Sequence, residues 1–357
     1  MNTFDNQKDN FFSFLKNIDE TDKIGIIAHG TCNDGLISSI FLNEILKDKF
    51  PKMFKPFLVF SDYDLDIFEK ISKEFKINKI NKVFVLDMSI NSEIVESFEQ
   101  FCKEFDVCYI DHHPSDFEIK FLKNIIKTES ADCTSLNLYK LGQPFLNKPY
   151  FNELLCAALV SEFSYNKFNN MKILQEFHPE ITLENINYSE PFKLSNVLGS
   201  VVIYYKNNSF KSYELVLNKK ISEIDEIHKI ISREVEKNIK NFDKLNSNLD
   251  ECVLFYETSS IFSLDSIIST ILSVRNDSKI IVVYSISNSN PELINVSARC
   301  QIKSLLYSMS DLLKAGIYGF NSSTAGGHFR ASGCSFLKKD LEIFKKQVIS
   351  YVKSRAN

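Results

Sequence analysis

The sequence predicts an α/β protein of two domains joined by a long helix. Short apolar runs alternate with segments whose apolar residues recur at helical spacing, which is typical of a mostly parallel sheet with helical crossovers. The 357 residues are enough for two domains of ordinary size. A charged amphipathic segment over 222–246 separates two such alternating regions. We therefore expect an N-terminal domain over 1–220, a linker helix over 221–248 and a smaller α/β domain over 249–357.

Composition and charge exclude several classes of protein. Hydrophobic residues make up 44% and charged residues 25% of the chain, the balance of a soluble globular protein. The formal net charge of -4 argues against a protein that coats long duplex nucleic acid, although it allows a local basic pocket for a short anionic ligand. The start of the chain has no basic segment leading into an apolar one, and no apolar run is long enough to cross a bilayer. We expect a cytoplasmic protein with no membrane partner.

The 8 cysteines are scattered, and none forms a C-x-x-C pair. This spacing argues against a zinc ribbon or a dithiol redox site. Most of the thiols are expected to be small buried hydrophobes in a reducing compartment.

The elements of the two domains follow from apolar periodicity and turn residues. In the first domain we expect strands over 24–28, 57–60, 83–86 and 107–110, and helices over 36–50, 64–75, 93–104, 131–141 and 152–164. Residues 201–205 and 213–217 flank an Asn-rich turn, which predicts a β-hairpin. In the second domain we expect strands over 252–256, 280–285 and 293–299, helices over 264–274, 303–313 and 340–354, and a glycine-rich loop over 325–333.

Acids and histidines follow three of the predicted strands. His29 and Asp34 come after the first strand, Asp87 after the third, and Asp111-His112-His113-Pro114 after the fourth. The carboxyl ends of parallel strands lie at one edge of a sheet, where α/β proteins bind ligands. Carboxylate and imidazole together suit a divalent transition metal better than Ca²⁺ or a structural zinc site. The sequence therefore predicts a metal site at this edge. His228, on the linker helix, has no such acids around it and is expected to be a surface residue.

These motifs resemble those of the DHH phosphoesterases, a family that includes RecJ-like exonucleases and small oligoribonucleases. Residues 29–35, HGTCNDG, resemble the first motif in its HG-x-C-x-DG form, and Asp87 resembles the second. Residues 111–114 resemble the signature itself. Residues 297–299 and 326–328 resemble the DHH-associated C-terminal domain, and the branch that the chain most resembles is the oligoribonuclease (nanoRNase) type.

The resemblance implies a role for each of these residues. Two Mn²⁺ ions, replaceable by Mg²⁺ or Co²⁺, would be held by His29, Asp34, Asp87 and His112. Asp87 would bridge the ions. Asp111 would support them either as a direct ligand or by contacting a residue that is a ligand. His113 would face the scissile phosphate. Two cations about 3.5–4 Å apart can activate a water and neutralise a leaving oxygen in an in-line displacement.

Two positions depart from the commonest pattern of the family. Many members carry an acid where this chain has Cys32, whose soft thiol could weaken one metal site or could simply pack beside Gly35. The fourth motif usually supplies an Asp, for which the best candidate here is Glu162. Its alternative reading is an ordinary surface acid on a helix.

The C-terminal domain is expected to hold the part of the substrate that does not react. The predicted substrate-binding residues are Arg299, Gly326, Gly327, His328 and Arg330. Arginine suits a phosphate through bidentate hydrogen bonds, and adjacent glycine amides can complete an anion site. The alternative for Arg299 is a surface ion pair.

The expected function is that of a manganese-dependent phosphodiesterase. Its substrate would be a short single-stranded oligonucleotide or dinucleotide, cleaved to mononucleotides, and a homodimer is compatible with the sequence. Other readings are a cyclic-dinucleotide phosphodiesterase and a phosphatase acting on 3′-phosphoadenosine phosphate. A reading from another class is a degenerate, non-catalytic nucleotide-binding protein, which Cys32 and Glu162 favour.

Overall fold

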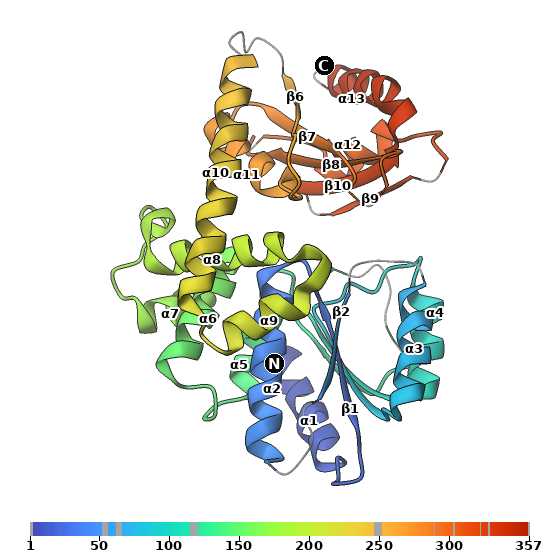
Figure 1. Ribbon diagram of the computed structural model, residues 1–357, viewed down its shortest axis with the longest axis vertical. Helices are drawn as coiled ribbons and strands as arrows, with labels where there is room; N and C mark the ends of the chain where they lie inside the picture. The colour runs from blue at the N-terminus through green and yellow to red at the C-terminus, as the bar shows by residue number, and fades with distance from the viewer. Residues whose placement is uncertain are drawn as a thin grey trace. The chain divides into compact units, whose positions relative to one another are not determined.

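The computed structural model describes residues 3–51, 56–61, 66–114, 119, 121–245, 252–288, 290–302, 304–321, 323–327 and 329–355. The chain divides into two compact units, Met1–His228 and Lys229–Asn357, each described here by itself (Figure 1). The expected α/β class is confirmed, with a parallel sheet in the first unit and a mixed sheet in the second.

The sheet of the first unit has the strand order β2-β1-β3-β4-β5, and all of its pairs are parallel. Its strands are β1 (Ile24–His29), β2 (Phe57–Ser61), β3 (Lys82–Leu86), β4 (Asp106–Asp111) and β5 (Asn124–Lys127). The four expected strands are present. The fifth, β5, was not expected because its sequence, NIIK, is too short to show a period.

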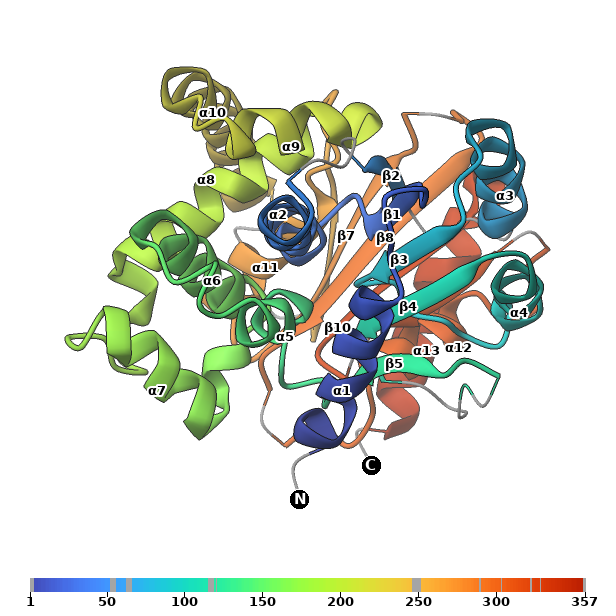
Figure 2. The same ribbon diagram turned by 90° about the horizontal axis from the view of Figure 1, so that it is seen from below.

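Helices cover both faces of this sheet (Figure 2). On one face α3 (Ile67–Asn78) and α4 (Val95–Glu104) pack their phenylalanines against the strands. On the other lie α1 (Thr3–Lys16), α2 (Asn33–Lys49) and α5 (Thr134–Leu141). The helix α1 was not expected, yet Phe11 and Phe14 from it are buried against Phe84 of β3.

The remaining helices of this unit are α6 (Pro149–Ser161), α7 (Phe168–Phe177), α8 (Glu190–Tyr204) and α9 (Ser209–Leu217). The expected hairpin is therefore wrong, because residues 201–205 end α8 and its following turn while 213–217 lie in α9. The error arose from the β-branched Val201 and Val202, which favour strands. Together with Leu198 they are buried at helical spacing, so packing overrides the local preference.

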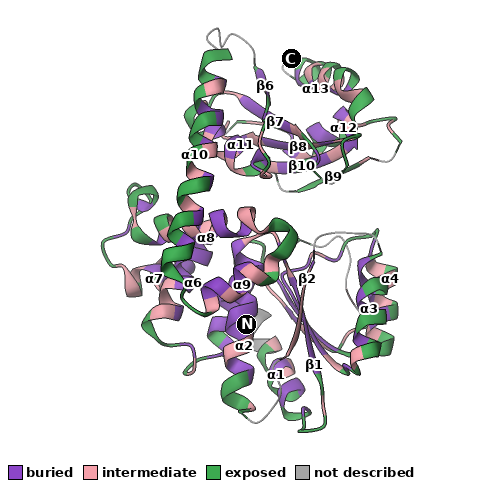
Figure 3. Cartoon of the chain, viewed as in Figure 1, coloured by how far each residue is buried: buried purple, intermediate pink, exposed green. Residues whose placement is uncertain are grey.

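The linker helix is α10 (Ile221–Leu245), and the division between the two units falls within it. Its predicted apolar stripe is buried at Ile224, Ile227, Ile231, Val235 and Phe242. Figure 3 shows the exposed residues on the rest of the helix. Leu245 continues the apolar spacing at the end of the helix but is 76% exposed. Among the described residues, no helix combines the length and the apolar character needed to cross a bilayer.

The sheet of the second unit has the order β6-β7-β8-β10-β9. Its strands are β6 (Val253–Glu257), β7 (Ile280–Ile286), β8 (Leu293–Cys300), β9 (Thr324–Gly327) and β10 (Ala331–Leu337). Only β6 and β7 pair in parallel. The expected loop over 325–333 is thus wrong, because most of it forms an antiparallel hairpin between β9 and β10. The sequence does not indicate this pairing, because glycines have no side chains and so show no alternation of apolar and polar residues.

Helices cover this second sheet, and α10 also packs on it through the contact of Phe242 with Tyr256 of β6. The other helices are α11 (Asp265–Arg275), α12 (Met309–Gly316) and α13 (Leu341–Arg355). The core lies between the sheet and the pair α12 and α13, and includes Val296, Ala298 and Phe336. Because side chains alternate along a strand, Ser297 and Arg299 face the other way, towards α11. The helix expected over 303–313 begins later, at Met309, behind a capping box formed by Ser308 and Asp311.

Candidate metal centre

The order of the sheet brings the acids and histidines of the first unit together. Strands β3 and β1 are neighbours, as are β3 and β4, so their carboxyl ends meet. His29 is the last residue of β1, Asp87 follows β3, and Asp111 ends β4 just before His112 and His113. The predicted clustering of these residues is what the structure shows. Their metal-binding and catalytic roles stay predictions.

Asp87 stands at the centre of the cluster. Its Oδ2 lies 3.8 Å from His29 Nδ1, and its Oδ1 lies 3.4 Å from His112 Nε2 and 3.9 Å from His113 Nδ1. The backbone of Asp87 has a φ of 56°, a left-handed conformation that Asp tolerates better than most residues. Burial acts to raise the pKa of Asp87, but contacts with His112 and His29 outweigh it and hold that pKa well below its usual range. The carboxylate is therefore charged, with Oδ2 towards His29 and Oδ1 towards His112 and His113.

Asp34 lies in the first turn of α2 and is buried. Its carboxylate oxygens accept hydrogen bonds from the amides of Thr134 at 2.7 Å and Ser135 at 2.8 Å, at the start of α5. Its Oδ2 lies 3.7 Å from His112 Nε2. Burial and the nearby charge of Asp87 raise the pKa of Asp34 to about 8. A cation at this position would favour the charged form.

His112 provides the test of whether a metal fits. The residue is only 3% exposed, and within the described part of the chain neither ring nitrogen has a hydrogen-bond partner, although Nε2 lies 3.4 Å from Asp87 Oδ1. A buried polar atom without a partner is costly, and coordination of a metal removes that cost. Burial acts to lower the pKa of His112, but Asp87 and Asp34 outweigh it and raise that pKa to about 10. The site thus combines unsatisfied imidazole with an excess of acid, which suits a divalent cation.

Asp111 is buried behind His113 with its oxygens occupied by donors. His113 Nδ1 lies 2.7 Å from Oδ1, while Oδ2 accepts from the His113 amide at 3.1 Å, from the Tyr109 hydroxyl at 2.9 Å and from Lys127 Nζ. This arrangement fits the support of His113 better than direct coordination of a metal. Burial acts to lower the pKa of His113, and the contact with Asp111 outweighs it and raises that pKa.

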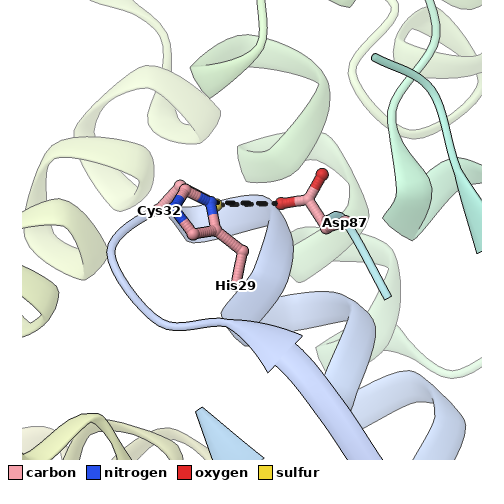
Figure 4. A group of neighbouring side chains, drawn as sticks. All are labelled: His29, Cys32 and Asp87. Atoms are coloured by element: carbon pink, nitrogen blue, oxygen red, sulfur yellow. Dashed lines mark hydrogen bonds and ion pairs between the residues drawn. The ribbon is translucent and has the colours of Figure 1, made fainter. Parts of the chain in front are cut away.

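Cys32 lies at the centre, and the charge of Glu162 acts on it. Cys32 Sγ donates a hydrogen bond to Asp87 Oδ2 at 3.0 Å, and with His29 the three residues place ligand atoms within 4.8 Å of one another (Figure 4). Glu162 follows the last turn of α6 and is half-buried. Burial and the charge of Asp87 raise its pKa, and its own charge acts on Asp34 and His112. Glu162 is thus close enough to share in the electrostatics of the centre.

Sequence reasoning missed two side chains of this centre. Lys127 ends the unexpected strand β5 and pairs with Asp111. Thr134 donates its hydroxyl to Asp87 Oδ1 at 3.3 Å and its amide to Asp34. Neither belongs to a pattern of metal ligands. The only available signal was position, since Lys127 follows an apolar pair and Thr134 lies near the start of the helix expected over 131–141.

The predicted substrate-binding residues lie in the second unit. Arg299 is half-buried on β8 and donates to Ser266 Oγ at 2.9 Å and to the Ala298 carbonyl at 3.1 Å. No carboxylate partner is present for it among the described residues, which argues against the alternative of a surface ion pair. Burial lowers the pKa of Arg299 to about 10, so it remains charged at neutral pH.

The other predicted substrate-binding residues flank the turn between β9 and β10. Gly326 and Gly327 end β9, where Gly327 has a φ of 138° that only glycine adopts readily. Arg330 is exposed and donates to the Gln301 carbonyl at 3.0 Å. His328 lies outside the described residues. On α10, His228 is half-buried rather than on the surface, with its Nδ1 2.9 Å from Ser200 Oγ.

Comparison with known proteins gives the fold a precedent. No family model and no curated protein sequence matches the chain. RecJ from Thermus thermophilus in complex with Mn²⁺ is similar, with a TM-score of 0.69 and 14% identity over 98% of this chain and 55% of RecJ. An exonuclease RecJ bound to manganese gives a TM-score of 0.65 and 13% identity over 97% of this chain and 94% of that one. An exopolyphosphatase-related protein from Bacteroides fragilis gives a TM-score of 0.57 and 15% identity, over 99% of this chain and 98% of that one.

These similarities show the fold, which is the RecJ-like fold that the DHH resemblance implies. The chain spans about half the length of the Thermus RecJ. Activity and substrate are therefore matters for proposal.

Proposed function

We propose that this chain is a metal-dependent phosphodiesterase that cleaves short single-stranded oligonucleotides or dinucleotides to mononucleotides. The observation that carries the proposal is the cluster around Asp87, in which the buried ring of His112 has no hydrogen-bond partner in the described chain. The RecJ-like fold supports it, since two similar structures are exonucleases or RecJ proteins bound to Mn²⁺.

Metal ions would be held by His29, Asp34, Asp87 and His112, with Asp87 shared between two Mn²⁺ ions. Mg²⁺ or Co²⁺ could replace them. When bound, such ions stabilise developing charge on a phosphate and make water a better nucleophile at neutral pH. The chain's own contribution is to hold several acids and imidazoles at one edge of the sheet, where repulsion between the carboxylates favours a bound cation.

His113 is proposed to act on the scissile phosphate. The hydrogen bond of 2.7 Å between its Nδ1 and Asp111 Oδ1 fixes the ring, so that Nε2 is the nitrogen that would face the substrate. Because Asp111 raises the pKa of His113, the ring is more readily protonated and can donate to a phosphate oxygen or leaving group. Asp111 is thus proposed as the residue that positions and charges His113, with a direct contact to metal as the weaker reading.

Arg299 is proposed to bind a phosphate of the substrate that does not react. Its guanidinium is charged and without a carboxylate partner in the described residues, and a planar fork of donors suits phosphate. Gly326, Gly327, Arg330 and His328 are proposed to complete this anion site. Binding energy from such a remote contact can be used to position the reacting group.

A substrate panel tests the proposal. Metal-free protein would be supplied with Mn²⁺ and incubated with di- to decanucleotides, cyclic dinucleotides, 3′-phosphoadenosine phosphate and inorganic polyphosphate, with His112→Ala as the inactive control. We expect mononucleotides to appear fastest from the shortest oligonucleotides. Faster turnover of a cyclic dinucleotide or of 3′-phosphoadenosine phosphate would establish that alternative. Absence of hydrolysis with every substrate and metal would favour a non-catalytic nucleotide-binding protein.

A further inference from the structure

We propose that the metal centre is chemically unequal. The side formed by His29, Cys32 and Asp87 takes a borderline-soft divalent ion such as Zn²⁺ or Co²⁺ with Cys32 as a thiolate ligand. The side formed by Asp87, His112 and Asp34 takes a hard ion such as Mn²⁺. The inference rests on the proposed metal-dependent function and revises one part of it: of the two proposed ions, only the one on the side of His112 and Asp34 is Mn²⁺.

The position of Cys32 is set by the tight start of α2. Its Sγ accepts a hydrogen bond from the Gly35 amide at 3.1 Å, which makes Cys32 the residue that caps the helix. A Cβ on Gly35 would lie 2.1 Å from the His29 carbonyl oxygen, so only glycine lets the loop fold this closely over the end of β1. Packing beside Gly35 and facing the metal centre are therefore compatible roles, because the same sulfur serves both.

The distances around Cys32 fit a shared cation. Sγ lies 3.0 Å and His29 Nδ1 lies 3.8 Å from the same oxygen, Asp87 Oδ2 (Figure 4). A tetrahedral ion with nitrogen, oxygen and sulfur ligands at about 2.0–2.3 Å places neighbouring ligand atoms about 3.3–3.8 Å apart. The two separations from Asp87 Oδ2 lie within a few tenths of an ångström of that range, and all three ligand atoms lie within 4.8 Å of one another. The hydrogen bond from the thiol to Asp87 would be replaced by two bonds to the ion.

His29 is also oriented for this role. Its Nε2 lies 2.9 Å from Thr31 Oγ1, and its Nδ1 points towards Asp87. When Nε2 carries the proton and donates it to the threonine hydroxyl, Nδ1 presents its lone pair to the space shared with Cys32. Histidines that bind metals commonly donate their other N–H to an oxygen in this way.

The chemistry of the two sides differs. Thiolate ligands favour Zn²⁺ and Co²⁺ over Mn²⁺ and Mg²⁺, which prefer oxygen. Burial and the charge of Asp87 raise the pKa of the Cys32 thiol, so without metal the sulfur keeps its proton. On binding, the S–H bond breaks, a sulfur–metal bond forms, and the proton passes to water. The independent sign of a second ion is His112. Neither of its buried ring nitrogens has a hydrogen-bond partner in the described chain, and Nε2 lies 3.4 Å from Oδ1, the other oxygen of Asp87.

The test uses Co²⁺, because a thiolate bound to Co²⁺ gives a charge-transfer band in the near ultraviolet. Co²⁺ would be titrated into the metal-free chain of 357 residues. We expect the band in the wild type, its loss in Cys32→Ser, and its retention in Cys102→Ser, which removes a half-buried thiol from α4. Co²⁺ affinity in Cys32→Ser should fall at least about tenfold, since loss of even an indirect metal contact costs that much. A wild type without the band, or a band that survives in Cys32→Ser, would overturn the inference.

Two further measurements keep the test decisive if Cys32→Ser does not fold. In competition between Zn²⁺ and Mn²⁺, Cys32→Asp should shift the bound metal towards Mn²⁺ at least about tenfold, because it supplies a hard oxygen. An unchanged ratio counts against the inference. In the wild type, Co²⁺ should protect Cys32 from alkylation, while the exposed Cys252 reacts equally with and without metal. Equal alkylation of Cys32 in both states also counts against it.

Hydrolysis assays separate this inference from the proposed function. A thiolate band in a protein that hydrolyses no phosphodiester would refute the function and support the unequal centre. Mn²⁺-dependent hydrolysis in a protein that shows no band would refute the unequal centre alone.

Discussion

Substitution of Lys127 by methionine tests how the centre holds a buried charge. Lys127 Nζ donates to Asp111 Oδ2, and Asp111 in turn orients His113. Methionine keeps much of the length and apolar stem of lysine but removes the cation. The Asp111 carboxylate is left in a buried position with hydrogen bonds from Tyr109 and His113 only. The variant therefore isolates the contribution of one charged donor.

The magnitude follows from the burial of the pair. A hydrogen bond to a charged group contributes about 1.5–3 kcal/mol, and removing one partner of a fully buried ion pair costs about 3–5 kcal/mol. The Asp111 side chain is 0% exposed but that of Lys127 is 22% exposed, which lowers the cost. The remaining donors lower it further. We expect Lys127→Met to reduce the free energy of unfolding by about 2 kcal/mol.

The matched control is Lys82→Met on the same sheet. Lys82 Nζ lies 2.7 Å from Asp106 Oδ2, but here the acid side chain is 46% exposed. Solvent screens such a pair, so the expected loss is about 0–1 kcal/mol. Both variants would be compared with the wild type by urea unfolding of the 357-residue chain, and by hydrogen exchange of the amides in β4 and β5. Equal losses in the two variants would refute the idea that burial makes the Asp111 pair different.

Three further outcomes are expected. Asp87→Ala should abolish hydrolysis and lower the amount of bound Mn²⁺ while the circular dichroism spectrum is unchanged. If the variant kept wild-type activity and metal content, Asp87 would not be a ligand shared by two ions. In the metal-free protein the pKa of Asp34 is raised from 3.8 to about 8 and that of His112 from 6.5 to about 10. A raised pKa gives stability that is complete below the unfolded value and is lost as the pH rises through the folded value. The unfolding temperature of the metal-free protein should therefore fall from about pH 4 towards pH 10, and an upward slope in this range would contradict the assignment. Arg299→Ala should impair hydrolysis of a dinucleotide far more than that of a small generic phosphodiester, whereas equal losses would mean that Arg299 maintains the fold instead of binding substrate.

The sequence by itself determined which strands carry the centre. Apolar runs ending at His29, Asp87 and Asp111 define parallel strands whose carboxyl ends must meet, because parallel pairing aligns them. The residue types at those ends then predict a metal, since several acids and imidazoles crowded together need a cation. The inference about the strands succeeds because strand direction follows from local properties of the chain, whereas the metal stays a prediction.

Two segments adopt another secondary structure than their local sequence favours, because the deciding information is not local. Val201 and Val202 favour a strand by their branched side chains, yet they are buried at the spacing of a helix in α8. Gly326 and Gly327 look like a loop but pair as β9 with β10. In both segments tertiary packing and ladder hydrogen bonds outweigh a local preference of about 1 kcal/mol.

Only the tertiary structure decided which groups share one charge environment. The pairing of Lys127 with Asp111 depends on β5, a strand too short to be seen in the sequence. The hydrogen bond from the Thr134 amide, at the start of α5, to the Asp34 carboxylate joins residues 100 positions apart. The contact of the Cys32 thiol with Asp87 likewise depends on how closely the loop folds over the strand end. Hydrogen bonds and pKa values are set by distances of a few ångströms between distant residues, and a linear pattern does not contain those distances.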